Sequence, residues 1–107
     1  MFRHVVLFRW ADHVDDAHVD RVAAGLDGLP GTISEIRAYH HGRDAGLADT
    51  NYDYVVVGDF DDEAAYLTYR DHPVHRKLVD DLFTGNVAER AAVQYEYELV
   101  SDTSEPN

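Results

Sequence analysis

The chain has 107 residues, a formal net charge of −12 and no cysteine. A chain of this length builds one hydrophobic core, so a single domain is expected over residues 1–100, and disulfides and thiolate chemistry are excluded. The negative charge argues against nucleic acid and anionic membrane surfaces as partners, and the apolar runs are too short to cross a bilayer.

Residues 2–10 alternate as a β-strand does. One face carries mainly rings and one histidine: Phe2, His4, Val6, Phe8 and Trp10. The other face has Val5 and Leu7 at its centre. Because both faces are apolar in the middle, this strand is expected to be covered on two sides.

A helix is predicted next, with three aspartates as candidates for its N-cap: Asp12, Asp15 and Asp16. Its apolar face has the i, i+3, i+4, i+7 spacing at Val19, Val22, Ala23 and Leu26. The segment 28–31, Gly-Leu-Pro-Gly, is expected to end this helix. A more polar strand, typical of a sheet edge, is predicted over residues 33–40, followed by a loop over 41–51.

Residues 52–60 are predicted to form the third strand, with Tyr54 and Val56 on one face. A short helix capped by the acidic residues 61–63 is expected to run to about Tyr69. A last strand alternates over residues 93–99, and residues 101–107 are expected to be a disordered tail.

Between the short helix and the last strand, Pro73 predicts a helix break. Asp71 or His72 is expected to cap a second helix that ends near residues 84–86. At about 100° per residue, one half of that helix is apolar: Val74, Leu78, Val79, Leu82 and Phe83. His75 falls in the middle of this half, one break away from Tyr69. A histidine on such a face is either an ordinary core residue or a functional group, and Tyr69 has the same two interpretations.

The order β-α-β-β-α-α-β predicts a ferredoxin-like α+β fold, a four-stranded antiparallel sheet with helices on one face. The second sheet face is then uncovered although it is apolar. A second copy of the chain is the simplest partner for it, so a homodimer paired through the sheet faces is predicted.

Several segments together resemble the stress-responsive dimeric α/β-barrel family, often called Dabb. They are the opening Arg3-His4-Val5-Val6-Leu7-Phe8-Arg9, the loop Gly42-Arg43-Asp44, the strand from Tyr52 to Val57, and Tyr69 with His72-Pro73-Val74-His75. The resemblance implies a homodimer whose paired sheets enclose a barrel, with a small cavity between sheet and helices in each subunit. One branch, the plant polyketide cyclases, closes a linear keto chain by aldol condensation without a cofactor.

In that branch a tyrosine and a histidine act together, and they correspond to Tyr69 and His75. The family's first-strand histidine corresponds to His4. Tyr54 stands where that branch has a smaller polar ring, whereas Val56 is retained. The expected catalytic set is therefore His75, Tyr69 and His4, and the expected substrate-binding set is Val6, Phe8, Tyr54, Val56 and Leu78.

Such a set suits acid–base chemistry on a keto or polyketide-like substrate. Neutral His75 would remove a proton alpha to a carbonyl, Tyr69 would donate a hydrogen bond to the enolate, and His4 would orient a partner or bind a carbonyl. The alternatives are a non-catalytic stress-response dimer that binds a small apolar ligand, and a cofactor-free monooxygenase. A metal site at His72, His75 and His4 is disfavoured because His72 lies off the apolar stripe, and no cofactor is expected.

The N-terminus leads directly into a strand pattern, without the regions of a signal peptide, so a cytoplasmic location is predicted. The acidity has two interpretations, solubility and a high-salt cytoplasm, between which the sequence does not choose.

Overall fold

A computed structural model describes residues 1–99. The elements along the chain are β1 (Phe2–Trp10), α1 (Asp16–Thr32), β2 (Ala38–Arg43), β3 (Tyr54–Phe60), α2 (Glu63–Asp71), α3 (Pro73–Leu78), the π-helix η1 (Val79–Phe83) and β4 (Val87–Glu96). This order confirms the predicted ferredoxin-like arrangement.

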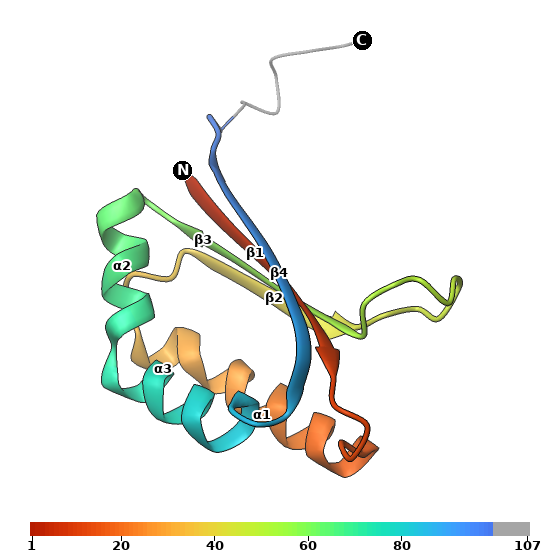
Figure 1. Ribbon diagram of the computed structural model, residues 1–107. Coiled ribbons are helices and arrows are strands. Elements are labelled where there is room, and N and C mark those ends of the chain that lie inside the picture. Colours follow the sequence, from red (N-terminus) through yellow and green to blue (C-terminus); the bar gives the residue numbers. More distant parts are fainter. Residues whose placement is uncertain (100–107) are drawn as a thin grey trace, which may run out of the picture.

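The four strands form one antiparallel sheet in the order β2-β3-β1-β4. All helices lie on the same side of this sheet (Figure 1). The register pairs Val6 with Val56 and Phe8 with Tyr54 between the two central strands, so these side chains point to the same face. The predicted edge position of the second strand is confirmed, because β2 pairs with β3 alone.

The inner face, toward the helices, carries the hydrophobic core. Phe60, Val22, Leu29 and Ile33 are the largest fully buried side chains. Burying a side chain of this size contributes about 1.5–3 kcal/mol, so the contact between α1 and the sheet is a main source of stability.

The outer face of the sheet is apolar along β1, β3 and β4, and no helix within residues 1–99 covers it (Figure 1). Val5 and Leu7 are only half-buried, and Val93 and Tyr95 on β4 are 59% and 45% exposed. Paired residues such as Val5, Val57 and Val93 lie next to one another across three strands. The result is a continuous apolar surface on the side opposite the helices.

The first helix does not end at residues 28–31 as predicted. α1 runs through Pro30 and Gly31 to Thr32, and the Ile33 N–H donates to the Leu29 carbonyl at 2.8 Å. Leu26 and Leu29 are buried, and their packing outweighs the one hydrogen bond that proline removes. The N-cap is Asp15, which accepts from the His18 N–H at 2.8 Å.

Three strand boundaries also differ from the prediction. β2 spans Ala38–Arg43 rather than residues 33–40, because Ile33 belongs to the end of α1. β3 begins at Tyr54, so the loop covers residues 44–53. β4 begins at Val87, well before residue 93, because its pairing with β1 extends from Trp10 to Phe2. Residues 88–92 do not alternate clearly, which is why the pattern missed them.

The predicted break before Pro73 is confirmed. His72 ends α2 and also caps α3, with its N–H on the Tyr69 carbonyl and its Nδ1 accepting from the Val74 N–H at 3.1 Å. The following helix is not uniform, since α3 passes into the π-helix η1 at Val79. Val74 is 42% exposed and so does not belong to the buried stripe on which it was placed.

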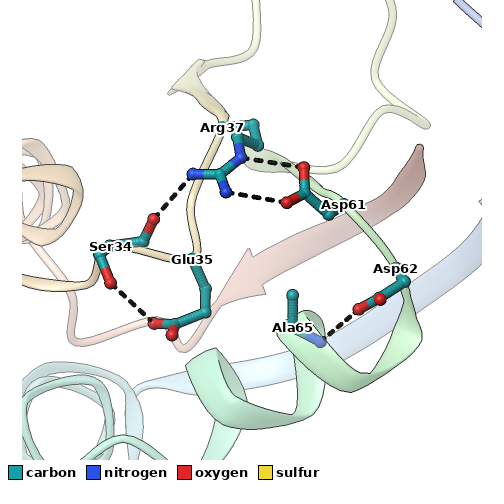
Figure 2. Close-up of polar contacts among 6 residues, drawn as sticks. All are labelled: Ser34, Glu35, Arg37, Asp61, Asp62 and Ala65. Carbon is teal, nitrogen blue, oxygen red and sulfur yellow. Dashed lines mark hydrogen bonds and ion pairs between the residues drawn. The ribbon is translucent and has the colours of Figure 1, made fainter.

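An ion pair fixes the start of α2 against the segment before β2. The Arg37 guanidinium donates from Nε and Nη2 to the Asp61 carboxylate at 2.9 and 2.8 Å, as Figure 2 shows. Beside it, the Asp62 carboxylate accepts from the Ala65 N–H at 2.8 Å and caps the helix. The position of α2 over the sheet is therefore set by two neighbouring carboxylates with separate tasks.

No helix within residues 1–99 is long and apolar enough to cross a membrane. The tail predicted over residues 101–107 lies outside the described residues.

Candidate functional site

A cavity of about 350 Å³ lies between the inner face of the sheet and the helices α1, α2, α3 and η1. Most of its wall is apolar or aromatic, and its polar groups are histidine, tyrosine, threonine and arginine side chains. The lining residues are His4, Val6, Phe8, Leu26, Tyr39, Val56, Tyr66, Tyr69, Arg70, His75, Leu78, Val79, Phe83, Thr84, Val87 and Arg90.

His75 stands on the first turn of α3, half-buried, with its ring 4.3 Å from the Tyr69 ring between centroids. Its Nδ1 lies 2.9 Å from the Arg70 carbonyl oxygen. Because a carbonyl only accepts, Nδ1 carries the proton and Nε2 of the neutral ring keeps a lone pair. Burial lowers the pKa of His75, so the neutral form is favoured at pH 7.

Tyr69 is buried at the end of α2, and its hydroxyl lies 2.7 Å from the Tyr39 hydroxyl. Burial raises the pKa of Tyr69 to about 12 and also raises the pKa of Tyr39, which faces the Tyr69 oxygen as well. Both phenols are therefore neutral hydrogen-bonding groups at pH 7.

His4 is buried on β1 with its ring 4.9 Å from the Tyr66 ring. The Gln94 amide donates to His4 Nδ1 at 2.9 Å, so the proton of the neutral ring is on Nε2. Burial, followed by the positive charges of Arg90 and His75, lowers the pKa of His4 to about 4. His4 and His75 thus present opposite groups, an N–H donor on one and a lone pair on the other.

The structure places seven of the eight predicted site residues on this cavity. They are His4, Val6, Phe8, Val56, Tyr69, His75 and Leu78. Tyr54 is not among the lining residues. Its hydroxyl lies 2.7 Å from Nδ1 of His41, whose Nε2 contacts the Asp27 carboxylate at 2.7 Å, so Tyr54 belongs to a neighbouring polar chain.

Five polar lining residues were not predicted: Tyr39, Tyr66, Arg70, Thr84 and Arg90. Tyr39 lies within the strand predicted over residues 33–40, but no pairing was predicted for that strand, and Arg90 lies outside the predicted last strand. A signal for Arg90 exists only in the pairing of β4 with β1, where it lies opposite Phe8.

Within residues 1–99, no three histidine or acidic side chains converge as they would around a metal ion.

Fold and cavity together define a class: a ferredoxin-like α/β domain with a small polar-and-aromatic cavity beneath its helices. The chain belongs to the stress responsive A/B barrel domain family, Dabb, whose profile matches residues 2–97. It is 24% identical to a stress-response A/B barrel domain-containing protein of Arabidopsis thaliana. The match extends over 101 residues and covers 92% of each of the two chains. The predicted family is therefore confirmed.

Solved structures show the same fold. A dimeric ferredoxin-like protein of unknown function from Thermobifida fusca is 42% identical, with a TM-score of 0.83 and 90% of each chain covered. The hydroxynitrile lyase of Passiflora edulis superposes with a TM-score of 0.79 over 94% of this chain and 95% of its own. Its identity is 16%, so this likeness concerns the fold alone.

Proposed function

We propose that this protein binds a small keto compound in the cavity and catalyses its enolisation, aldol closure or a related lyase step without a cofactor. One observation carries the proposal: the Arg70 carbonyl fixes the proton of His75 on Nδ1, which leaves Nε2 of a half-buried, neutral imidazole as a base on the cavity wall. Among residues 1–99, Nε2 has no hydrogen-bond partner.

The proposed chemistry starts with proton transfer from the carbon alpha to the carbonyl onto His75 Nε2. The C–H electron pair then forms the enolate, and the Tyr69 hydroxyl donates a hydrogen bond to the enolate oxygen. In aldol closure the enolate carbon attacks a second carbonyl, and the resulting alkoxide takes the proton back from the imidazolium. With a pKa of about 12, Tyr69 is suited to donate a hydrogen bond while keeping its proton.

His4 has a separate part in this proposal. Its Nε2–H is a donor that stays neutral at pH 7, because its pKa is about 4. Such a group holds a carbonyl oxygen without adding a charge to the cavity.

A second candidate is a non-catalytic protein that binds a small apolar ligand. The wall favours it, since Val6, Phe8, Leu26, Val56, Leu78 and Phe83 supply a largely apolar surface.

Exchange of the methyl protons of acetophenone in heavy water, followed by NMR, separates the two candidates. We expect the wild-type protein to accelerate exchange and His75→Gln to lower that acceleration about 100- to 10,000-fold. Tyr69→Phe is expected to lower it less, because it removes one hydrogen bond and leaves the base. His72→Asn is the matched control, since His72 does not line the cavity and asparagine also caps a helix. Equal exchange by wild type and His75→Gln would refute the enzyme and favour the ligand-binding protein.

We also propose that the protein is a homodimer joined through the outer sheet faces. The support is the apolar outer face, together with the dimeric state of the Thermobifida fusca protein. Light scattering should give twice the chain mass of 12.1 kDa at micromolar concentration, and a monomer there would contradict the proposal. The cytoplasmic location stays a prediction.

A further inference from the structure

The cavity wall has a charge opposite to that of the chain. The chain contains 21 acidic and 9 basic residues, yet none of the sixteen lining residues is acidic and two are arginines, Arg70 and Arg90. Both arginines are exposed, as is Thr84, so these residues form the mouth of the cavity. In a protein of this acidity, a cavity wall whose only charged residues are arginines attracts a small anion locally, although the Asp71 carboxylate pairs with one of them, Arg70.

The two arginines differ in what they bind. The Arg70 guanidinium is held by Asp71, with Nε and Nη2 at 2.9 and 3.2 Å from the carboxylate oxygens. Four other arginines also have a carboxylate partner: Arg3, Arg9, Arg37 and Arg43. Within residues 1–99 no carboxylate and no hydrogen-bond acceptor pairs with the Arg90 side chain, and Arg90 is the only such arginine on the cavity wall.

The sheet register directs Arg90 toward the site. Arg90 pairs with Phe8 and Gln94 with His4, so both β4 side chains lie on the inner face at the edge of the sheet. Between them Ala92, opposite Val6, adds little bulk. Burial is the main cause of the lowered pKa of His4, and the charge of Arg90 lowers it further. Burial raises the pKa of Tyr66, and the charges of Arg70 and Arg90 oppose that rise, so the guanidinium of Arg90 lies close enough to act on both groups of the wall.

We propose that the ligand of this cavity is an anionic keto compound, a small molecule whose carboxylate binds Arg90 at the mouth while its carbonyl lies deeper, toward His75 and Tyr69. The carbonyl part rests on the function proposed above, whereas recognition of the carboxylate does not require turnover. A planar guanidinium donates two parallel hydrogen bonds to a carboxylate, which makes it selective for this group.

Calorimetric titration with benzoylpropionate and with its methyl ester tests the proposal, because the two probes share the ketone and the ring and differ in charge. We expect wild type to bind the acid about 10- to 100-fold more tightly than the ester, and Arg90→Gln to abolish this preference. Arg21→Gln is the matched control: it removes the same charge from an exposed position of α1 that does not line the cavity, and should keep the preference.

Equal binding of acid and ester by wild type, no binding of either, or an unchanged preference in Arg90→Gln would each overturn the proposal. His75→Gln separates it from the proposed function. If the enzyme proposal alone is wrong, acetophenone exchange is the same in wild type and His75→Gln, while the acid preference persists in both.

Discussion

The two faces of the sheet are built from the same strands but differ in burial, because the helices cover only the inner face. On the inner face, β1 and β3 present rings and branched side chains that α1, α2 and η1 bury, including Phe8 and Phe60. On the outer face the alternate residues are just as apolar at the centre, but Val93 and Tyr95 remain exposed in the single chain.

The inner face therefore stabilises the single chain, whereas the outer face is available for contact with another chain. A single chain completes the inner face and still keeps a cavity of about 350 Å³ there, while the outer face has the composition of an interface. Polar groups follow the same division: His4 and Tyr69 line the cavity, whereas Arg3 and Asp59 form a bidentate pair at the side of the outer face.

The largest expected effect comes from placing a charge on the outer face. Val93→Asp would place one unpaired carboxylate from each subunit in the proposed interface, at a combined cost of about 3 kcal/mol or more, which raises the dimer dissociation constant roughly 100-fold or more. Sedimentation velocity should show the variant as a monomer at concentrations where wild type is a dimer. The folded chain itself should tolerate the change, because Val93 is already 59% exposed within it.

Leu67→Asp is the control for that variant. Leu67 is 36% exposed on α2, on the helical side of the molecule, and should not affect the mass. If the two variants had the same effect, the outer face would have no special part in assembly.

On the inner face, acid should unfold the protein through His4. The folded pKa of His4 is about 4, below the ordinary value of 6.5, so the unfolded chain takes up the proton first. The stability that this neutral ring contributes is fully present above pH 6.5 and is lost as the pH falls toward 4. The loss is at most about 3.5 kcal/mol, at about 1.4 kcal/mol per pKa unit.

Urea unfolding of wild type and His4→Gln across this pH range measures the contribution. The free energies of unfolding should fall less steeply with acid in the variant. His13→Gln, at an exposed position, should behave as wild type does. Parallel curves for wild type and His4→Gln would mean that folding does not lower the pKa of His4.

The smallest expected effect compares two strand glycines. A Cβ at Gly58 would lie 3.0 Å from Phe60 Cε1 and 3.3 Å from Tyr39 Cδ1, whereas one at Gly42 would meet nothing within 4 Å. Gly58→Ala should therefore cost about 1–3 kcal/mol of unfolding free energy and displace Tyr39, while Gly42→Ala should not. Thermal unfolding of the two variants measures the difference. Equal melting temperatures would show that Phe60 and Tyr39 move aside without loss of stability.

Much of the inner face was predictable from the sequence because strict alternation in β1 and a proline break are strong local signals. These signals put His4 and His75 on inward-facing positions and Tyr69 one break away from His75, and all three residues line the cavity. The family was predictable because several segments resemble it, and the ferredoxin-like arrangement was predictable from the order of the elements along the chain.

The remaining features depend on pairing between distant segments. Tyr39 meets Tyr69 only through the register of β2 on β3, which starts five residues later than the pattern indicated. Arg90 lies on the wall only because β4 begins at Val87. α1 continues past Pro30 because Leu29 is buried against the core. A rule based on the local sequence around a proline takes no account of such tertiary packing.

The break at Pro73 has one more consequence, for backbone groups. In a continuous helix the Arg70 carbonyl would accept from the N–H four residues later, that of Val74. Here the Val74 N–H donates to His72 Nδ1, so the Arg70 carbonyl oxygen accepts a hydrogen bond from His75 Nδ1 instead. The His75 ring therefore satisfies a free carbonyl at the end of α2, and this hydrogen bond also fixes the tautomer of His75. Straightening the two helices into one would return the oxygen to the backbone and release the imidazole.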